Sequence, residues 1–353
     1  MDVRLYGRSL GHGSHVVVTD GFASVLSERA TVHRVALDDD SLEEHPPGGA
    51  LSDWAWFTGP LNRVQIMHQN ARHRRRVVMV TPNSDRIPPR LLGAVASAAT
   101  DLMSPSEWAV DVVKSELAAL QIEIPVWLAP HGIGAEFTVR PAARERLRQV
   151  YRQGGFHLLH FASSERERKG TRELLRAWQL ADLPGGASLG MVLDAEAEMA
   201  IRHWMIEEDV KLSRVWLGRR LDRDAENMAD TYSLAHVVCQ PSRGEGFGLC
   251  PLEARASGVP VIATACTGHS AHMPAQSQDG VIVVPHGPPA PIDDLTGASA
   301  PTVSVDELAR VLWQAYADWE ALSEAAVAAA PRIAAQWQWR AQLGPVIEKM
   351  FQE

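Results

Sequence analysis

Short apolar runs rich in Val, Ile and Leu recur along the chain, and most of them are followed by a longer segment with helical periodicity. Runs of this kind are typical of strands that are buried on both faces of a parallel sheet. The predicted strands cover residues 3–6, 32–37, 76–81, 125–129, 156–161, 187–193, 214–217, 236–240 and 259–265. The predicted helices cover residues 15–28, 106–120, 142–152, 171–180, 224–235 and 251–257, followed by alanine-rich helices near the C-terminus.

The alternation of strands and helices predicts an α/β fold with two doubly wound, Rossmann-like domains. The first domain opens with a strand, a glycine-bearing loop at 7–14 and a helix. The pattern breaks at 130–133, where Pro, His, Gly and Ile precede a second strand-helix series. We therefore place the domains at 1–135 and 136–332.

Residues 286–302 interrupt the alternation. With the neighbouring Pro285 they contain five prolines, and they also contain Gly287 and Gly297. Prolines at this density predict an irregular insertion, because each one lacks the N–H that a central strand needs. The tryptophans that follow, at 313, 319, 337 and 339, are interpreted as packing residues of the terminal helices.

Composition and charge narrow the class of protein. With 46% hydrophobic and 22% charged residues the composition is that of a globular protein, which excludes a disordered or fibrous chain. The net charge of −9 gives no overall attraction to phosphate polymers, so an anionic partner would have to meet a local basic patch. One basic run exists between 63 and 76, with arginines at 63, 72, 74, 75 and 76. It is either a solvated surface or a site for nucleic acid or an anionic membrane.

The cysteines and the N-terminus bear on the compartment. The three cysteines, at 239, 250 and 266, lack metal-ligand spacing, and we interpret them as small buried residues of a reducing environment. The N-terminus has no basic stretch followed by an apolar run, and no segment approaches ~18 uninterrupted apolar residues. These features predict a cytoplasmic protein without a transmembrane segment.

The most informative segment is 240–265, where a glycine-rich loop joins a predicted strand to a short helix. Pro251 lies near the first helical turn, where its missing N–H costs nothing, and Gly258 ends the helix. A helix N-terminus approached by glycines offers unpaired N–H groups and a partial positive charge, which suit a diphosphate. Glu245 and Glu253 flank this surface, and their carboxylates are suitable acceptors for sugar hydroxyls.

This segment resembles the glutamate-x7-glutamate signature of the retaining GT-B glycosyltransferases of family 4, the glycosyl transferases group 1. The matching positions are Pro241, Ser242, 245–249, Glu253, Ala254 and 258–263. Weaker similarity covers nearly the whole chain, namely 11–15, 104–108, 130–137, Lys169 with Gly170, and the terminal tryptophans. The resemblance implies two Rossmann-like domains facing across a cleft, with a helix at 333–353 packing back on the first domain.

The resemblance also implies roles for individual residues. Glu245 would contact hydroxyls of the donor sugar, and Glu253 would contact the nucleotide ribose. Lys169 would neutralise the leaving diphosphate, whose charge grows in the transition state. The backbone between the two glutamates would contact sugar and phosphate at Gly246, Phe247, Gly248 and Leu249.

The sequence departs from the family pattern before Lys169. The arginine that usually precedes this lysine by five or six residues is replaced by Ser163 or Ser164. Arg168 or Arg166 is the expected substitute for binding the donor phosphate.

Further contacts are predicted at four weaker positions. Gly13, which forms a glycine pair with Gly11, resembles the loop residue that approaches the donor phosphate, although a plain turn is the alternative. His12 and His269 are expected to contact acceptor or sugar. Asn83 stands where the family has a histidine, and its amide can hydrogen-bond a hydroxyl but cannot act as an acid or base.

No metal is expected. The Asp-x-Asp matches at 38–40 and 222–224 are interpreted as an acidic turn and a helix start. The resemblance implies that lysine and the helix dipole neutralise the phosphate, so the expected co-substrate is a UDP- or GDP-hexose, without a further cofactor.

The sequence thus predicts a glycosyltransferase that moves a hexose from a nucleotide-diphosphate sugar to a hydroxyl acceptor with retention. The alternatives are a sugar-nucleotide epimerase of the same architecture and a catalytically weak sugar-nucleotide-binding protein. The acceptor stays open among a glycan, a lipid, a protein, a small molecule, and a modified base in DNA contacted by Arg72, Arg74, Arg75 and Arg76.

Overall fold

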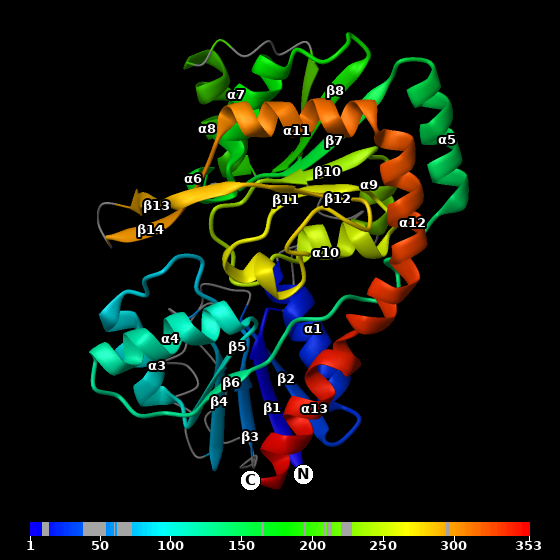
Figure 1. Ribbon diagram of the computed structural model, residues 1–353. Helices are drawn as coiled ribbons and strands as arrows, with labels where there is room; N and C mark the ends of the chain where they lie inside the picture. Colours follow the sequence, from blue (N-terminus) through cyan, green and yellow to red (C-terminus); the bar gives the residue numbers. More distant parts are fainter. Residues whose placement is uncertain are drawn as a thin grey trace. The chain divides into compact units, whose positions relative to one another are not determined.

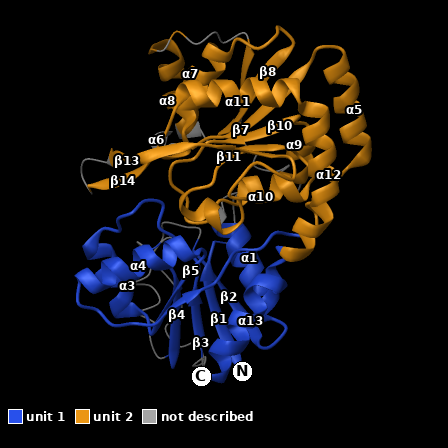
Figure 2. Cartoon of the chain, viewed as in Figure 1, with its two compact units in different colours: residues 1–134, 337–353 blue, residues 135–336 orange. Residues whose placement is uncertain are grey.

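The chain forms two compact units in a computed structural model (Figures 1 and 2). Unit 1 contains residues 1–134 and 337–353, and unit 2 contains residues 135–336. The structure describes residues 1–8, 14–37, 54–59, 61, 73–163, 166–193, 195–207, 209, 214–219, 228–293 and 297–353.

Unit 1 is a six-stranded parallel sheet with helices on both faces (Figure 1). In sheet order the strands are β2 (Thr31–Ala36), β1 (Asp2–Gly7), β3 (Trp54–Phe57), β4 (Arg75–Met79), β5 (Asp101–Ser104) and β6 (Val126–Leu128). One face packs on α3 (Pro89–Ala98) and α4 (Glu107–Ala119), and the other on α1 (Ser14–Leu26) and α13 (Trp339–Gln352). This arrangement is a doubly wound fold, as predicted.

The sequence did not predict two strands of unit 1, β3 and β5, or the helix α3. Strand β3 reads Trp-Ala-Trp-Phe, has all four residues buried, and contains no β-branched residue. Strand β5 begins with Asp101, a buried carboxylate that interrupts the apolar pattern. The predicted cap of α4 is confirmed, because the Ser106 hydroxyl accepts a hydrogen bond of 3.1 Å from the Ala109 N–H.

Unit 2 has a second six-stranded parallel sheet. In sheet order its strands are β12 (Val281–Val284), β11 (Val261–Thr264), β10 (Val237–Gln240), β7 (Phe156–Phe161), β8 (Ala187–Leu193) and β9 (Val215–Arg219). Its helices are α5 (Pro141–Arg152), α6 (Arg166–Lys169), α7 (Thr171–Ala181), α8 (Ala195–Glu207), α9 (Met228–Ser233), α10 (Leu249–Ala256), α11 (Val305–Ala317) and α12 (Trp319–Gln336). Helices α7, α8 and α11 cover one face of the sheet, and α10 and α12 lie on the other (Figure 1).

The prediction of an irregular insertion at 286–302 was wrong. These residues form the antiparallel strands β13 (His286–Asp293) and β14 (Ala298–Val303), in which Pro289 pairs with Pro301. A two-stranded ribbon has only edge strands, so prolines are tolerated where an N–H would face away from the partner. The Arg243 Nε donates a hydrogen bond of 2.8 Å to the Pro301 carbonyl, which ties the ribbon to the loop after β10.

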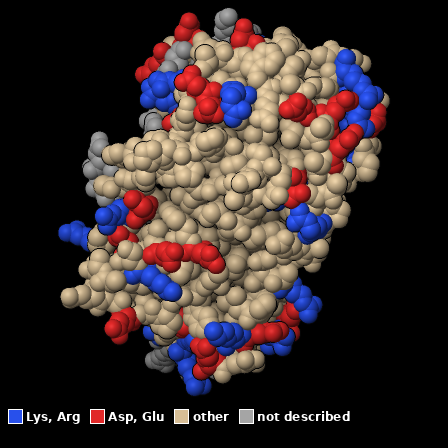
Figure 3. Space-filling model, viewed as in Figure 1, with Lys and Arg blue, Asp and Glu red and all other residues tan. Residues whose placement is uncertain are grey.

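Two arginines of the basic run, Arg75 and Arg76, are held by internal partners, whereas Arg74 is exposed. Arg75 makes a bidentate ion pair with Asp101 at 2.9 Å, lies 4.7 Å from the Trp54 ring centroid, and donates to the Met350 carbonyl. Arg76 donates to the Ala98 and His73 carbonyls. The interpretation of these two arginines as a nucleic-acid contact is therefore corrected, whereas Arg63 and Arg72 lie outside the described residues. On the face in Figure 3, Lys and Arg side chains are interspersed with Asp and Glu.

We expect Arg75→Ala to lower the free energy of unfolding by about 3 kcal/mol, because it leaves the buried Asp101 carboxylate without its cation. Urea unfolding followed by circular dichroism measures this change. The exposed neighbour supplies the control, since Arg74→Ala should change the free energy by less than about 0.5 kcal/mol. If Arg75→Ala changed the free energy of unfolding as little as Arg74→Ala, Arg75 would have no structural role.

Candidate functional site

The loop after β10 begins near the middle of the sheet of unit 2 and leads into α10. Residues 241–247 of this loop are buried, and Gly248 is the N-cap of α10 with a φ of +84°, a value that L side chains rarely adopt. No side chain caps this helix end. Helix α10 thus starts at the carboxyl edge of the sheet without a side-chain cap, and the partial positive charge of a helix N-terminus favours an anion.

Glu245 in this loop forms ion pairs with two cations from the segment after β7. The Lys169 ammonium donates to Oε1 at 2.6 Å, and the Arg168 guanidinium lies 3.0 Å from Oε2. Arg168 also donates to the Gly244 carbonyl at 2.7 Å. The structure thus brings the predicted site residue Glu245 into contact with two others, Lys169 and Arg168, which precede it by 76 and 77 positions.

Backbone contacts hold the two cations at the loop. Gly170 has a φ of +65°, and a Cβ atom there would overlap the Pro241 carbonyl oxygen. The Arg243 N–H donates to the Arg168 carbonyl at 2.7 Å. The chain at 168–170 therefore packs directly on the chain at 241–243, which positions the Lys169 side chain.

The charge of Glu245 is fixed by these neighbours. Burial alone would raise the pKa of this carboxyl, but Lys169 and Arg168 outweigh burial and hold the pKa well below its usual range. Glu245 is therefore an anion at neutral pH. With both cations the cluster has a net charge of about +1, which favours an arriving anion.

The second glutamate, Glu253, lies on α10 and is bound by Tyr232 of α9. The Tyr232 hydroxyl donates to Oε2 at 2.6 Å. Burial, together with the neighbouring Cys250 and Glu253, raises the pKa of Tyr232 well above its usual value, so the hydroxyl stays a donor. This contact orients the carboxylate that the resemblance assigns to the nucleotide ribose.

A short 3₁₀ helix, η4 (Thr267–Ala271), binds the backbone of the 241–248 loop. The Glu245 N–H donates to the Thr267 hydroxyl at 3.1 Å, and the Gly268 N–H donates to the Glu245 carbonyl at 2.7 Å. His272, just after η4, donates from Nε2 to the Phe247 carbonyl at 3.0 Å. The sequence predicted only ligand contacts for this turn. Its hydrogen bonds to the loop could not be predicted, because a contact between residues 22 positions apart leaves no local sequence pattern.

His269 of η4 is fully buried against the start of α10. Its Nδ1 donates to the Thr264 carbonyl at 3.1 Å. Its Nε2 has no hydrogen-bond partner among the described residues. The ring edge with Cδ2 and Nε2 occupies the space that a side chain at Gly248 would need, so Nε2 lies against the N-cap of α10.

His160 of β7 is a buried polar residue that sequence reasoning missed. One ring nitrogen bonds the Cys239 carbonyl of β10 and the other bonds the Thr171 hydroxyl at the start of α7, both at 2.9 Å. Burial lowers the pKa of His160 to about 4. The neutral ring joins the two central strands to the helix that follows Lys169.

The remaining predicted residues are placed as follows. Asn83 lies in unit 1 after β4 and is partly buried. Gly13 and His12 lie outside the described residues, as do Ser164 and both Asp-x-Asp matches. Of the cysteines, Cys239 and Cys266 are buried, whereas Cys250 in the first turn of α10 is partly exposed, which corrects the interpretation of all three as buried.

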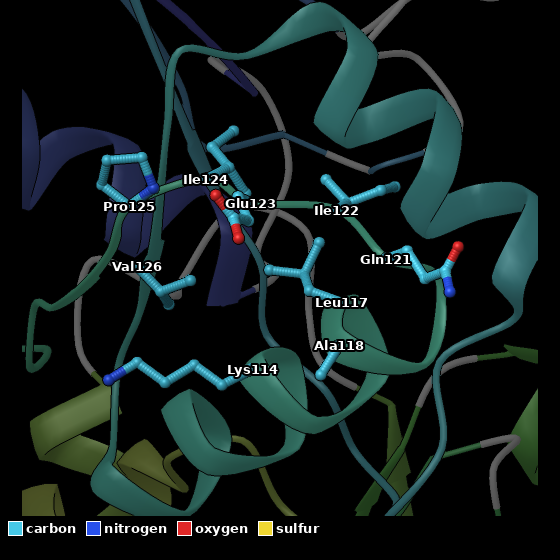
Figure 4. Close-up of a pocket in the computed structure, with 9 residues that line it drawn as sticks. All are labelled: Lys114, Leu117, Ala118, Gln121, Ile122, Glu123, Ile124, Pro125 and Val126. Atoms are coloured by element: carbon cyan, nitrogen blue, oxygen red, sulfur yellow. The ribbon is translucent and has the colours of Figure 1, made fainter.

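A pocket of about 760 Å³ lies elsewhere, in unit 1, beside the end of α4 and the chain that leads into β6 (Figure 4). None of the predicted site residues lines it. Within the described ranges, no group of His, Cys, Asp and Glu side chains is arranged to hold a metal ion. Among the described helices, none has the length and apolar character needed to cross a bilayer.

Comparison with known proteins bears on the class of this protein. Residues 155–297 match the family model of the glycosyl transferases group 1. This stretch runs from β7 into the β13–β14 ribbon and contains Lys169, Glu245 and Glu253. The resemblance predicted from the sequence, to the GT-B glycosyltransferases of group 1, is confirmed.

Solved structures agree on the fold along the whole chain. Sucrose-phosphate synthase from Thermosynechococcus elongatus aligns with a TM-score of 0.72 at 17% identity, covering 99% of both chains. Anabaena HepE in complex with UDP-glucose aligns with a TM-score of 0.72 at 16% identity, covering 100% of both chains. The fold is therefore GT-B, with two Rossmann-like parallel-sheet domains.

A curated relative matches over a shorter stretch. A D-inositol 3-phosphate glycosyltransferase of Kribbella flavida is 42% identical over 73 residues, which is 21% of this chain. The matched stretch spans 16% of that relative's length.

Proposed function

We propose that this protein transfers a hexose from a nucleotide-diphosphate sugar to a hydroxyl acceptor, with retention at the anomeric carbon. The main observation is the contact of Lys169 and Arg168 with Glu245 beside the uncapped start of α10. HepE, which has the same fold, was crystallised with UDP-glucose, and this supports a nucleotide sugar as the donor.

In this proposal the cations act on the leaving group. Charge develops on the diphosphate as the bond to the sugar breaks, and a fixed ammonium stabilises that charge more in the transition state than in the ground state. Lys169 supplies this ammonium, and Arg168 supplies a guanidinium. The first-turn N–H groups of α10 add a partial positive charge. Arg168 would replace the arginine that the family usually places where Ser163 or Ser164 stands.

The two glutamates orient the donor. Glu245 would accept hydrogen bonds from sugar hydroxyls, and Glu253, oriented by Tyr232, would accept them from the ribose. Retention requires the acceptor hydroxyl to attack from the face that the diphosphate leaves, and no enzyme nucleophile is assigned in this scheme.

Two measurements test the proposal. A thermal-shift screen of UDP- and GDP-hexoses should give at least one donor that raises the melting temperature, because a ligand selective for the folded state stabilises it. That donor is then incubated alone and with a panel of hydroxyl acceptors, and nucleotide release and sugar products are measured by chromatography.

The outcomes separate the proposal from its alternatives. Acceptor-dependent release of nucleotide diphosphate with formation of a glycoside supports transfer. A new sugar nucleotide from the donor alone would identify an epimerase, and tight binding without turnover on any acceptor would identify a binding protein.

A further inference from the structure

The His269 ring has a lone pair without a hydrogen-bond partner in the interior of unit 2. Because Nδ1–H donates to the Thr264 carbonyl, the neutral ring has its unprotonated nitrogen at Nε2. The residue is 0% exposed, and Nε2 has no partner within the described part of the chain. Buried polar atoms are almost always paired, so this exception requires an explanation.

Charged and titratable groups face His269 from each packed element. Glu245 of the 241–248 loop favours the protonated ring, whereas Lys169 and Arg168 of α6 oppose it. The His272 ring lies 5.9 Å away, and His272 is itself kept neutral by burial, which lowers its pKa to about 3. Arg255 of α10 donates to the His272 carbonyl and adds a more distant positive charge.

Burial is the largest influence on the free ring and lowers the pKa of His269 to about 4. His269 is therefore neutral near pH 7. A neutral ring whose lone pair lies against the N-cap of α10 is unfavourable to an anion bound there, and a protonated ring is favourable.

We propose that binding of a nucleotide-diphosphate sugar at the start of α10 is coupled to the uptake of one proton by the Nε2 atom of His269. The proton comes from solvent and forms an N–H bond on the ring, and no other bond changes. This inference rests on the proposed donor site and specifies how its affinity is regulated.

Two effects of the bound ligand favour the protonated ring. The diphosphate adds negative charge at the start of α10, where the ring edge of His269 lies against Gly248. It also attracts Lys169 and Arg168, the two cations that oppose protonation. Both effects raise the pKa of His269 in the complex above its value in the free protein. Affinity is then highest at low pH and falls as pH rises through the pKa of the complex.

His160 is a matched reference within the same unit. It is also fully buried, with a pKa lowered to about 4, but both of its ring nitrogens have hydrogen-bond partners. Lys169 and Glu245 act on its pKa as well, but neither of its ring nitrogens lacks a partner, so its protonation state should respond less to the donor than that of His269.

Isothermal titration calorimetry of the full chain with UDP-glucose and GDP-mannose tests the coupling. Both probes are diphosphate diesters without a phosphate group that titrates near neutral pH, so proton uptake reports on the protein. Titrations in two buffers of different ionisation enthalpy should give uptake of about half a proton or more at pH 6, falling toward zero at pH 8. The dissociation constant should rise at least about twofold between these pH values.

The variant His269→Asn keeps a donor for the Thr264 carbonyl and removes the proton acceptor. It should bind the probe with no proton uptake and with little dependence on pH. Long-range ¹H–¹⁵N spectra of the histidine rings should show a larger change at His269 than at His160 on addition of the probe.

A failure of the proton coupling can be distinguished from a failure of the proposed donor site. Probe binding without proton uptake, or with uptake that persists in His269→Asn, overturns the coupling and leaves the donor site intact. If neither probe nor any other UDP- or GDP-hexose binds, the proposed function and the coupling both fail.

Discussion

Replacing Lys169 with alanine is expected to lower the turnover of sugar transfer about 100-fold, because removal of one fixed donor to a developing negative charge typically has an effect of this size. The Michaelis constant for the donor should change much less than turnover, since the interaction grows as the bond to the leaving group breaks. Steady-state kinetics with the donor found in the thermal-shift screen measures both parameters.

Lys114→Ala is the control for this variant. Lys114 is exposed on α4 in unit 1, and its removal should leave transfer unchanged. Circular dichroism should show that both variants are folded. Near-native turnover in Lys169→Ala would contradict the assignment of the leaving-group role.

Replacing Glu245 with alanine is expected to lower transfer at least about tenfold, because the sugar hydroxyls lose their acceptor and the two cations lose the carboxylate that positions them. The double variant Lys169→Ala with Glu245→Ala should be little slower than Lys169→Ala alone, since groups that act as a unit are not additive.

The control for Glu245 is Glu145→Ala, which removes an exposed carboxylate of α5 that pairs with Arg148 on the same helix. It should leave the rate of transfer unchanged. Additive losses in the double variant would indicate that Lys169 and Glu245 act independently, and native rates in both single variants would exclude the site.

Mostly apolar strands that follow a turn signal could be predicted from the sequence. Strands β7 and β8 were predicted with their observed ends, because each is a mostly apolar run that begins directly after a pair of glycines. Strand β5 could not be predicted, because Asp101 becomes compatible with a buried strand only through Arg75, Trp127 and Thr100. Those partners are tertiary contacts and leave no local pattern.

The candidate site also has one feature that local sequence predicts and others that depend on tertiary contacts. The helix start at Gly248 follows from glycines and Pro251 in one short segment, so local chemistry predicts it. The approach of Lys169 to Glu245 depends on the packing of Gly170 against Pro241, and only the family resemblance pointed to it. The unpaired Nε2 of His269 depends on which atoms surround the ring, and no sequence pattern contains that information.

The division of the chain has a consequence for folding during synthesis. One face of the sheet of unit 1 is covered by α13, whose Leu343, Ile347 and Met350 are almost fully buried. These residues leave the ribosome after the whole of unit 2, which is continuous from 135 to 336. The usual order, in which the N-terminal domain is finished first, is therefore reversed. Unit 2 can complete its core while unit 1 still has an uncovered apolar sheet face, and that face is where a chaperone would be needed.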